Sequence, residues 1–375
     1  MKISRTDQLP VPKSSGKGSS NRRVLLLCAL AAVAWCGLSA HWHFFQEASA
    51  IAATNALTPV VRQAERFDLS PPLRDIEPAK APASFAAAGA QREIPLGRLR
   101  RTRVTAASNT NTKEEAPSLD PVVQSFAPVP KTPAPTTAFE GISNADNTAL
   151  TGFAVLPPDP VGDVGPDHYV QAVNDLMEVF SKSGVSLLGP IRISALFGGF
   201  GGHCETDDDG DAIVLYDHLA DRWLISQLGA AFIGPPFHQC LAISQTGDPT
   251  GAYYRYDFQM PNDNFNDYPK FGVWPDAYYM SDNQFQPPAF NFAGAGVFAF
   301  ERAKMLTGDP TASYIYFDLE SVDSSIGGLL PADLDGPAPP PGTPNYFAYF
   351  TATKFGDAQD GLRIFEFYAD FAKPG

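Results

Sequence analysis

The chain has 375 residues and a formal charge of −14 at pH 7, from 27 Lys and Arg against 41 Asp and Glu. This balance excludes an extended binding surface for nucleic acid or anionic lipid, since both need clustered positive charge. The charge is unevenly spread: residues 1–140 carry a net +6, whereas residues 141–375 carry −20 and contain all 13 tyrosines. We therefore expect a basic leader followed by an acidic, aromatic-rich globular domain.

The N-terminal segment has the pattern of an export signal. Residues 1–23 hold six basic side chains and one acid, and Val24–Ala40 is a charge-free, mostly apolar run. A basic n-region before an apolar h-region is typical of a signal peptide, and Ala48-Ser49-Ala50 fits a cleavage site. A retained membrane anchor is the alternative, since the run is close to the shortest that spans a bilayer. Both place the rest of the chain beyond the inner membrane (secreted, periplasmic or at the cell surface), with membrane contact only through residues 24–40.

Residues 51–140 form a segment rich in Ala, Pro, Thr, Arg and Ser. Stretches such as residues 127–135, with four prolines in nine positions, favour polyproline II and bury little apolar surface. We expect a disordered linker here, acting as a spacer or a pro-region.

Residues 141–375 have the pattern of an all-β domain. Short runs of aromatic and β-branched residues, such as Tyr253–Phe258 and Tyr314–Leu319, are bounded by Gly, Pro, Asp and Asn. Turn chemistry separates them, as in Gly247-Asp-Pro249. The one helical turn that we expect is Arg302–Leu306.

An internal repeat indicates how these strands are organised. Residues 246–258 (TGDPTGAYYRYDF) match residues 307–319 (TGDPTASYIYFDL) at an offset of 61. Repeats of this length made of short strands suggest propeller blades. We expect a β-propeller-like array of about four blades near residues 160–195, 211–260, 267–320 and 325–370, with a β-sandwich as the alternative.

Three phrases carry a resemblance to a known family. They are PPDPVGDVGPDHYVQAVN (157–174), LYDHLADRWLISQ (215–227) and DYPKFGVWPDAYYM (267–280). In this order they resemble a poorly characterised family of large exported bacterial proteins with a propeller-like fold. The resemblance implies an exported location and that fold, and it supplies no reaction and no catalytic residues. The family pattern also suggests further chain after the fourth unit, so the domain could be a truncated form.

The two cysteines of the domain, Cys204 and Cys240, are expected to form a disulfide, because two thiols in one exported domain usually pair. On the chain-entropy model, closing this loop contributes roughly 3–4 kcal/mol. A zinc site with His203, His218 and His238 is the alternative. The tight C-x₂₋₄-C or H-x₃₋₅-H pairs typical of zinc sites are absent from the sequence.

Two acidic segments suggest calcium. The run 205–211 places Glu205, Asp207 and Asp209 at positions 1, 3 and 5 of a calcium loop, with Asp211 following, but position 12 is not Glu. The second segment spaces three acids four residues apart: Asp159, Asp163 and Asp167. Dense carboxylates repel one another unless a cation intervenes, so we expect calcium as the cofactor, with a solvated acidic loop as the alternative.

The sequence contains no G-x-S-x-G, H-E-x-x-H or P-loop motif. A glycosidase needs two converging carboxylates, and thirty acids give too many pairs to choose from. Aromatic faces could stack on sugar rings, and Trp274, Tyr278 and Tyr279 are candidates, although aromatic residues in short strands usually belong to the core.

We expect a recognition domain for a glycan or a surface protein that is not an enzyme. The alternatives are an extracellular hydrolase or lyase that acts on polysaccharide through acids at the propeller mouth, and a truncated remnant without independent function.

Overall fold

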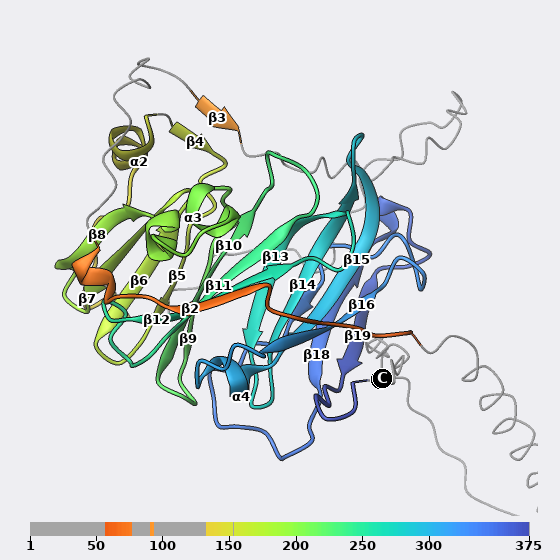
Figure 1. Cartoon of the computed structure of the whole chain (residues 1–375). Coiled ribbons are helices and arrows are strands. Elements are labelled where there is room, and N and C mark those ends of the chain that lie inside the picture. The colour runs from red at the N-terminus through yellow and green to blue at the C-terminus, as the bar shows by residue number, and fades with distance from the viewer. Residues whose placement is uncertain (1–56, 77–90, 94–132, 153, 375) are drawn as a thin grey trace, which may run out of the picture.

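The computed structural model describes residues 57–76, 91–93, 133–152 and 154–374 (Figure 1). The predicted n-region at 1–23 and the apolar segment at 24–40 lie outside these residues. Within the described ranges no helix is both long and apolar enough to cross a membrane.

The domain is mostly β-sheet with few helices, as the sequence predicts. Four antiparallel sheets follow one another along the chain, each a meander in which consecutive strands pair. Their ranges match the four predicted units. Sheet 1 has β5 (Val161–Val164), β6 (His168–Val173), β7 (Leu176–Ser181) and β8 (Ser186–Arg192); sheet 2 has β9 (Ile213–Asp217), β10 (Arg222–Gly229), β11 (His238–Ser244) and β12 (Tyr253–Gln259); sheet 3 has β13 (Phe265–Val273), β14 (Tyr278–Gln286), β15 (Asn291–Phe300) and β16 (Ser313–Asp318); sheet 4 has β17 (Leu330–Pro331), β18 (Asn345–Thr351) and β19 (Gly361–Phe367).

The first strands of successive sheets are neighbours in space. β5 contacts β9, β9 contacts β13, and β13 contacts β17. Side-chain carboxylates also accept backbone hydrogen bonds between successive sheets: Tyr216 N on β9 donates to Asp163 Oδ2 on β5 at 2.7 Å, and Val273 N on β13 donates to Asp333 Oδ1, two residues after β17, at 2.7 Å. The first strands of successive sheets therefore lie side by side.

Three apolar cores lie between the sheets. The core between sheets 1 and 2 includes Trp223, the core between sheets 2 and 3 includes Phe258 and Phe298, and the core between sheets 3 and 4 includes Phe317 and Phe347. Each sheet thus buries its apolar faces against the next, which explains why short strands of alternating aromatic residues suffice for this domain.

The sequence repeat marks equivalent strands. Its two copies end in β12 and β16, the fourth strands of sheets 2 and 3. The turns before these strands are capped alike: Asp248 Oδ1 accepts from Thr250 N at 2.9 Å, and Asp309 Oδ1 accepts from Thr311 N at 2.8 Å. The Gly-Asp-Pro-Thr phrase therefore encodes one turn used twice.

Residues 57–76, which we call the strap, cross the outer edges of sheets 2 and 3 (orange in Figure 1). β1 (Val60–Gln63) pairs with β16, and β2 (Arg66–Leu69) pairs with β12. The prediction of a disordered linker over 51–140 is wrong for this part, because an exposed edge strand offers ladder hydrogen bonds to almost any extended segment. The strap is also held by side chains: Asp68 accepts from Arg255 Nε at 2.7 Å and from Nη2 at 2.6 Å.

The helices are short. α4 (Arg302–Met305) confirms the predicted helical turn. α2 (Asn144–Thr151) was not predicted, although Ser143 and Asp146 form a capping box at its start, which is a signal that the sequence contains. The remaining elements are α3 (His203–Thr206), the parallel pair β3 (Gln91–Glu93) and β4 (Ala154–Leu156), and 3-10 turns at Leu73–Asp75, Ile193–Phe197 and Thr353–Phe355.

Candidate functional site

Three residues at or just before the first strands of sheets 1 to 3 have positive φ angles. Asp159 and Asp211 each lie two residues before β5 and β9, and their φ angles are 37° and 48°. Tyr268, with φ 55°, lies two residues before Lys270, where β13 resumes regular pairing with β14. All three are in the left-handed region, which non-glycine residues seldom occupy. Charge interactions link Asp159 to Asp211, and Asp211 to Asp267 beside Tyr268, so these segments lie close together.

A β-bulge in β13 places two further side chains at this point. The register runs from Asp267 opposite Asn283 to Lys270 opposite Ser281, so three steps on β13 match two on β14. In a regular strand, residues three apart point to opposite faces. The extra residue cancels that alternation, so the bulge directs Asp267 and Lys270 to the same face.

Contacts and charge interactions link these groups into one cluster, which we call the carboxylate–lysine cluster (Asp159, Asp211, Asp267 and Lys270). Tyr268 N donates to Asp211 Oδ2 at 3.0 Å, and Lys270 Nζ lies 3.7 Å from the centroid of the Tyr268 ring. The cluster runs from solvent into the protein: Asp159 is exposed, Asp211 and Lys270 are half-buried, and Asp267 is 6% exposed.

Burial and neighbouring carboxylates raise carboxyl pKa values in the cluster. Burial, and then the charge of Asp211, raises the pKa of Asp267 to about 8. Burial, and then the charge of Asp159, raises the pKa of Asp211 above its usual value. Burial lowers the pKa of the Lys270 ammonium, against the opposing charges of all three acids. Near neutral pH, Asp267 thus keeps a proton beside groups that are ready to accept one.

A second buried acid lies behind the cluster. Asp282, on β14, is 4% exposed, and burial raises its pKa to about 7. Its Oδ1 accepts from Gly296 N at 2.8 Å, and a Cβ at Gly296 would lie 2.4 Å from that oxygen. The charge of Asp282 further raises the pKa of Asp267, so this neighbour helps to keep the Asp267 proton in place.

The seven predicted calcium ligands do not gather at one point. Asp159 and Asp211 belong to the carboxylate–lysine cluster, whereas Asp163 accepts from the β9 backbone and Asp167 is exposed. The other three accept backbone hydrogen bonds, Glu205 from Gly201 N, Asp207 from Ala230 N and Asp209 from Ala231 N. Over the described part of the chain, the side-chain groups close enough together to share a metal ion include none of the seven. Calcium binding stays a prediction.

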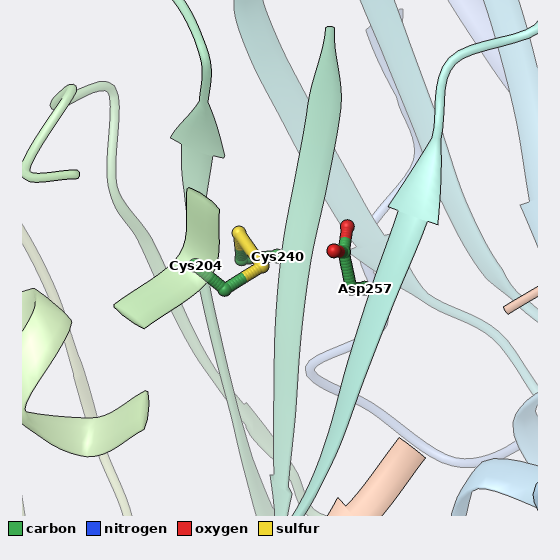
Figure 2. A group of neighbouring side chains, drawn as sticks. All are labelled: Cys204, Cys240 and Asp257. Atoms are coloured by element: carbon green, nitrogen blue, oxygen red, sulfur yellow. A yellow bond between two sulfur atoms is a disulfide. The ribbon is translucent and has the colours of Figure 1, made fainter. Parts of the chain in front are cut away.

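The predicted disulfide is confirmed. Cys204 of α3 is bonded to Cys240 of β11, the third strand of sheet 2 (Figure 2). Of the three histidines proposed as alternative zinc ligands, His203 and His238 lie close together, with ring centroids 5.3 Å apart. His218 lies elsewhere, with Nε2 2.8 Å from the Gly336 carbonyl oxygen. The three do not form one ligand set.

The aromatic residues predicted to bind a ligand are buried. Trp274 is 7% exposed, and Tyr278 and Tyr279 are 0% exposed. Their polar atoms are used inside the protein; Tyr278 Oη, for example, donates to Asp217 Oδ2 at 2.8 Å. That prediction is wrong for all three, and the core-packing alternative holds. The aromatic side chain beside the cluster is Tyr268, which is 42% exposed.

Sequence reasoning missed Asp267, Tyr268 and Lys270. A signal was available: the pair Asp159-Pro160 directly precedes β5, and the pair Tyr268-Pro269 lies in the first half of β13, so both first strands have an X-Pro pair near their start. Aligning the units on these X-Pro pairs would have placed Asp267 and Lys270 next to Asp159.

No family model matches the chain, and no curated protein matches it. Among solved structures, it is similar to a GH43 endo-arabinanase from Bacillus licheniformis, at 12% sequence identity and a TM-score of 0.27. The match covers 57% of this chain and 94% of that one. A likeness this distant assigns no site and no substrate.

Proposed function

We propose that the four sheets are blades of a β-propeller and that their first strands line its axis. Two observations support this: each sheet is a meander, and each first strand contacts the first strand of the next sheet. In a propeller the innermost strands surround a central channel, and their ends form the usual place for a site. The carboxylate–lysine cluster lies at such ends.

We further propose that the cluster is an acid–base site for hydrolysis. The observation that carries this is the Asp267 carboxyl, whose pKa of about 8 keeps it protonated beside the carboxyl of Asp211, which in turn interacts with Asp159. Two groups of one chemical kind whose environments separate their proton affinities provide an acid and a base at one pH. Asp267 would donate the proton to the leaving group, Asp159 at the solvent end would activate water, and Asp211 would hold the Asp267 proton through its charge.

The substrate class that fits this chemistry is a glycan. Glycosidic bonds are cleaved by a carboxylic acid and a carboxylate acting together, without a serine or cysteine nucleophile. The half-exposed Tyr268 ring gives the cluster an aromatic surface against which a sugar ring can lie.

We propose that the protein acts outside the cytoplasm. The Cys204–Cys240 disulfide supports this, since structural disulfides persist in oxidising compartments. The basic and apolar pattern of residues 1–40 supports export in the same direction.

The experiment is a reducing-end assay of the purified full chain against neutral and acidic polysaccharides, compared with Asp267→Asn. We expect product release from at least one polysaccharide, and a loss of about 10²–10⁴-fold in kcat/KM in the variant, because the proton donor is removed. The pH profile should fall as the pH rises through about 8, where Asp267 loses its proton.

The matched control is Asp167→Asn, which removes one exposed carboxylate at the edge of sheet 1, outside the cluster. It should keep the wild-type rate. If no polysaccharide in the panel is cleaved, or if Asp267→Asn cleaves as fast as the wild type, the hydrolytic proposal is wrong.

Recognition of a glycan or a protein without turnover is a second candidate. The low exposure of Asp267, 6%, favours it, because a proton donor must reach its substrate. Binding on a glycan array without product release, weakened by Asp159→Asn at the solvent end, would select this function.

A further inference from the structure

The strap contributes a carboxylate to a group of side chains on the outer part of sheet 2. Between β1 and β2 the strap makes a two-residue step, where Glu65 N donates to the Asp257 carbonyl oxygen at 2.8 Å. This bond holds Glu65 beside β12. Its side chain is 49% exposed, so its carboxylate can move.

The partners of Glu65 are buried. His238, the first residue of β11, and Asp257 on β12 have side chains that are 6% and 2% exposed. His238 Nδ1 lies 2.7 Å from Asp257 Oδ1 and 4.0 Å from Glu65 Oε2. One imidazole nitrogen therefore faces two carboxylates, one fixed in the sheet and one on the strap.

The spacing of these atoms suits a small divalent ion. One ligand atom from each of Glu65, His238 and Asp257 lies within 4.8 Å of the others. Zinc binds nitrogen and carboxylate oxygen at about 2.0–2.2 Å, which in a tetrahedron separates ligand atoms by about 3.3–3.6 Å. The distances from His238 Nδ1 to the Asp257 and Glu65 oxygens, 2.7 and 4.0 Å, lie on either side of that range. The half-exposed Glu65 side chain can move to bring its oxygen to the required distance.

The charges point the same way. Two carboxylates face one imidazole, against one neighbouring cation on the strap. That cation, Arg66, stands opposite Asp257 in the ladder and its charge reaches His238, while its guanidinium lies against Gly201 and Gly202. The Cys204–Cys240 disulfide lies next to Asp257, because the sulfur of each cysteine is within 4.8 Å of the Asp257 carboxylate (Figure 2). A disulfide does not compete for the ion as thiolates would.

We propose that Glu65, His238 and Asp257 form a zinc site that fixes the strap to sheet 2, with the fourth position open to water on the Glu65 side. The ion replaces the hydrogen bond between His238 and Asp257 by bonds to both and draws Glu65 in as the third ligand. Three protein ligands and one water is a common zinc arrangement. The proposal is independent of the acid–base site.

The test uses the full chain with its disulfide intact, stripped with a chelator and titrated with ZnCl₂ by calorimetry. We expect one equivalent of Zn²⁺ to bind, with a rise in Tm of roughly 5–10 °C at a hundredfold excess over Kd, since the ion binds only the folded state. CaCl₂ should not bind there, because the imidazole nitrogen is a poor ligand for calcium.

Glu65→Gln should weaken zinc binding at least tenfold while the apo protein keeps its Tm, because Glu65 is half-exposed and its backbone hydrogen bond is unchanged. The matched control is Asp75→Asn, which removes an exposed carboxylate from the same strap and should bind as the wild type. Absence of binding, or unchanged binding by Glu65→Gln, overturns the proposal.

Co²⁺ as a spectroscopic substitute gives a second measurement that needs no variant. Bound by one imidazole and two carboxylates, it should show weak visible bands and no intense sulfur-to-cobalt band in the near ultraviolet. An intense sulfur band would assign the ion to reduced Cys204 and Cys240, and would also overturn the proposal.

Discussion

An acid lies at or near each end of β9, and the two acids differ in burial and in their hydrogen-bond partners. At its C-terminal end, Asp217 is 0% exposed, and its oxygens accept from Arg302 Nε at 2.7 Å and Arg302 Nη2 at 2.9 Å. Before its N-terminal end, Asp211 accepts from one backbone N–H, at Tyr268, and burial, and then the charge of Asp159, raises its pKa. Asp217 is paired with two N–H donors of the Arg302 guanidinium, whereas Asp211 belongs to a cluster of acids around a single lysine, Lys270.

This difference separates charges that stabilise the fold from charges that we propose to act in a functional site. Asp217 and Arg302 join sheet 2 to the α4 connection of sheet 3, so their ion pair positions two sheets. The carboxylate–lysine cluster joins no such pair, and its raised carboxyl pKa values mean that ionisation there costs folding free energy. Strongly shifted groups of this kind gather at functional sites more often than elsewhere.

The largest effect is expected from Arg302→Met, which breaks the matched pair. It leaves Asp217 buried without its cation, and we expect a loss of about 3–5 kcal/mol in the free energy of unfolding. Urea unfolding at pH 7 measures it. The control is Arg363→Met, whose partner Asp323 and itself are 33% and 34% exposed, and which should cost less than about 1 kcal/mol. Equal losses in the two variants would remove the distinction drawn for Asp217.

The second effect has the opposite sign. The pKa of Asp267 is about 8 in the folded protein and about 4 in an unfolded chain. Its protonation therefore favours the folded state, and this contribution is complete below pH about 4 and lost as the pH rises to about 8. Asparagine does not ionise, so the Asp267→Asn variant does not lose stability in this way as the pH rises. It should be more stable than the wild type at pH 9, by a few kcal/mol at most, and nearly as stable as the wild type at pH 4.

Urea unfolding of Asp267→Asn and the wild type at these two pH values measures the difference. Asp167→Asn, in an exposed position, should show no such dependence. A wild type that is as stable as the Asn variant at pH 9 would mean that Asp267 ionises without cost, and the acid–base proposal would lose its proton donor.

The sequence predicts the sheets better than it predicts the site. Sheet ranges follow from local patterns, as in Tyr253–Gln259, where alternation and the preceding Gly-Asp-Pro turn are adjacent in the chain. The disulfide could also be predicted, because Cys204 and Cys240 are the two cysteines of residues 141–375, and two thiols in a domain that is expected to be exported usually pair.

The cluster could not be predicted in full, because it depends on a bulge and on contacts between sheets. Asp267 and Lys270 share a face only through the extra residue at Tyr268, and regular alternation would separate them. The strap was missed for a related reason. Its two four-residue strands, Val60–Gln63 and Arg66–Leu69, form because they pair with the edge strands of sheets 3 and 2. The prediction for this region used the average composition of residues 51–140, which does not reveal two such short segments.

The smallest effect on stability is expected from Lys270→Met. Lys270 lowers the pKa values of Asp159, Asp211 and Asp267, so its loss should raise all three, which carboxyl NMR titration measures. Burial already lowers the pKa of the Lys270 ammonium, so an apolar side chain of similar length should change the free energy of unfolding by about 1 kcal/mol or less. Lys270→Arg, which keeps the charge, should leave the carboxyl pKa values nearer those of the wild type.

Both Lys270→Met and Arg302→Met remove one cation from beside buried aspartates, so the comparison between them isolates what pairing contributes. In the matched pair the cation is needed for folding, and its loss should appear as lost stability with little effect on carboxyl titration elsewhere. In the cluster, loss of the Lys270 cation should instead raise the carboxyl pKa values, because Asp267 and its neighbours can bind protons and so offset the lost positive charge. A Lys270→Met variant destabilised as strongly as Arg302→Met would show that the cluster, too, is an ion pair built for the fold.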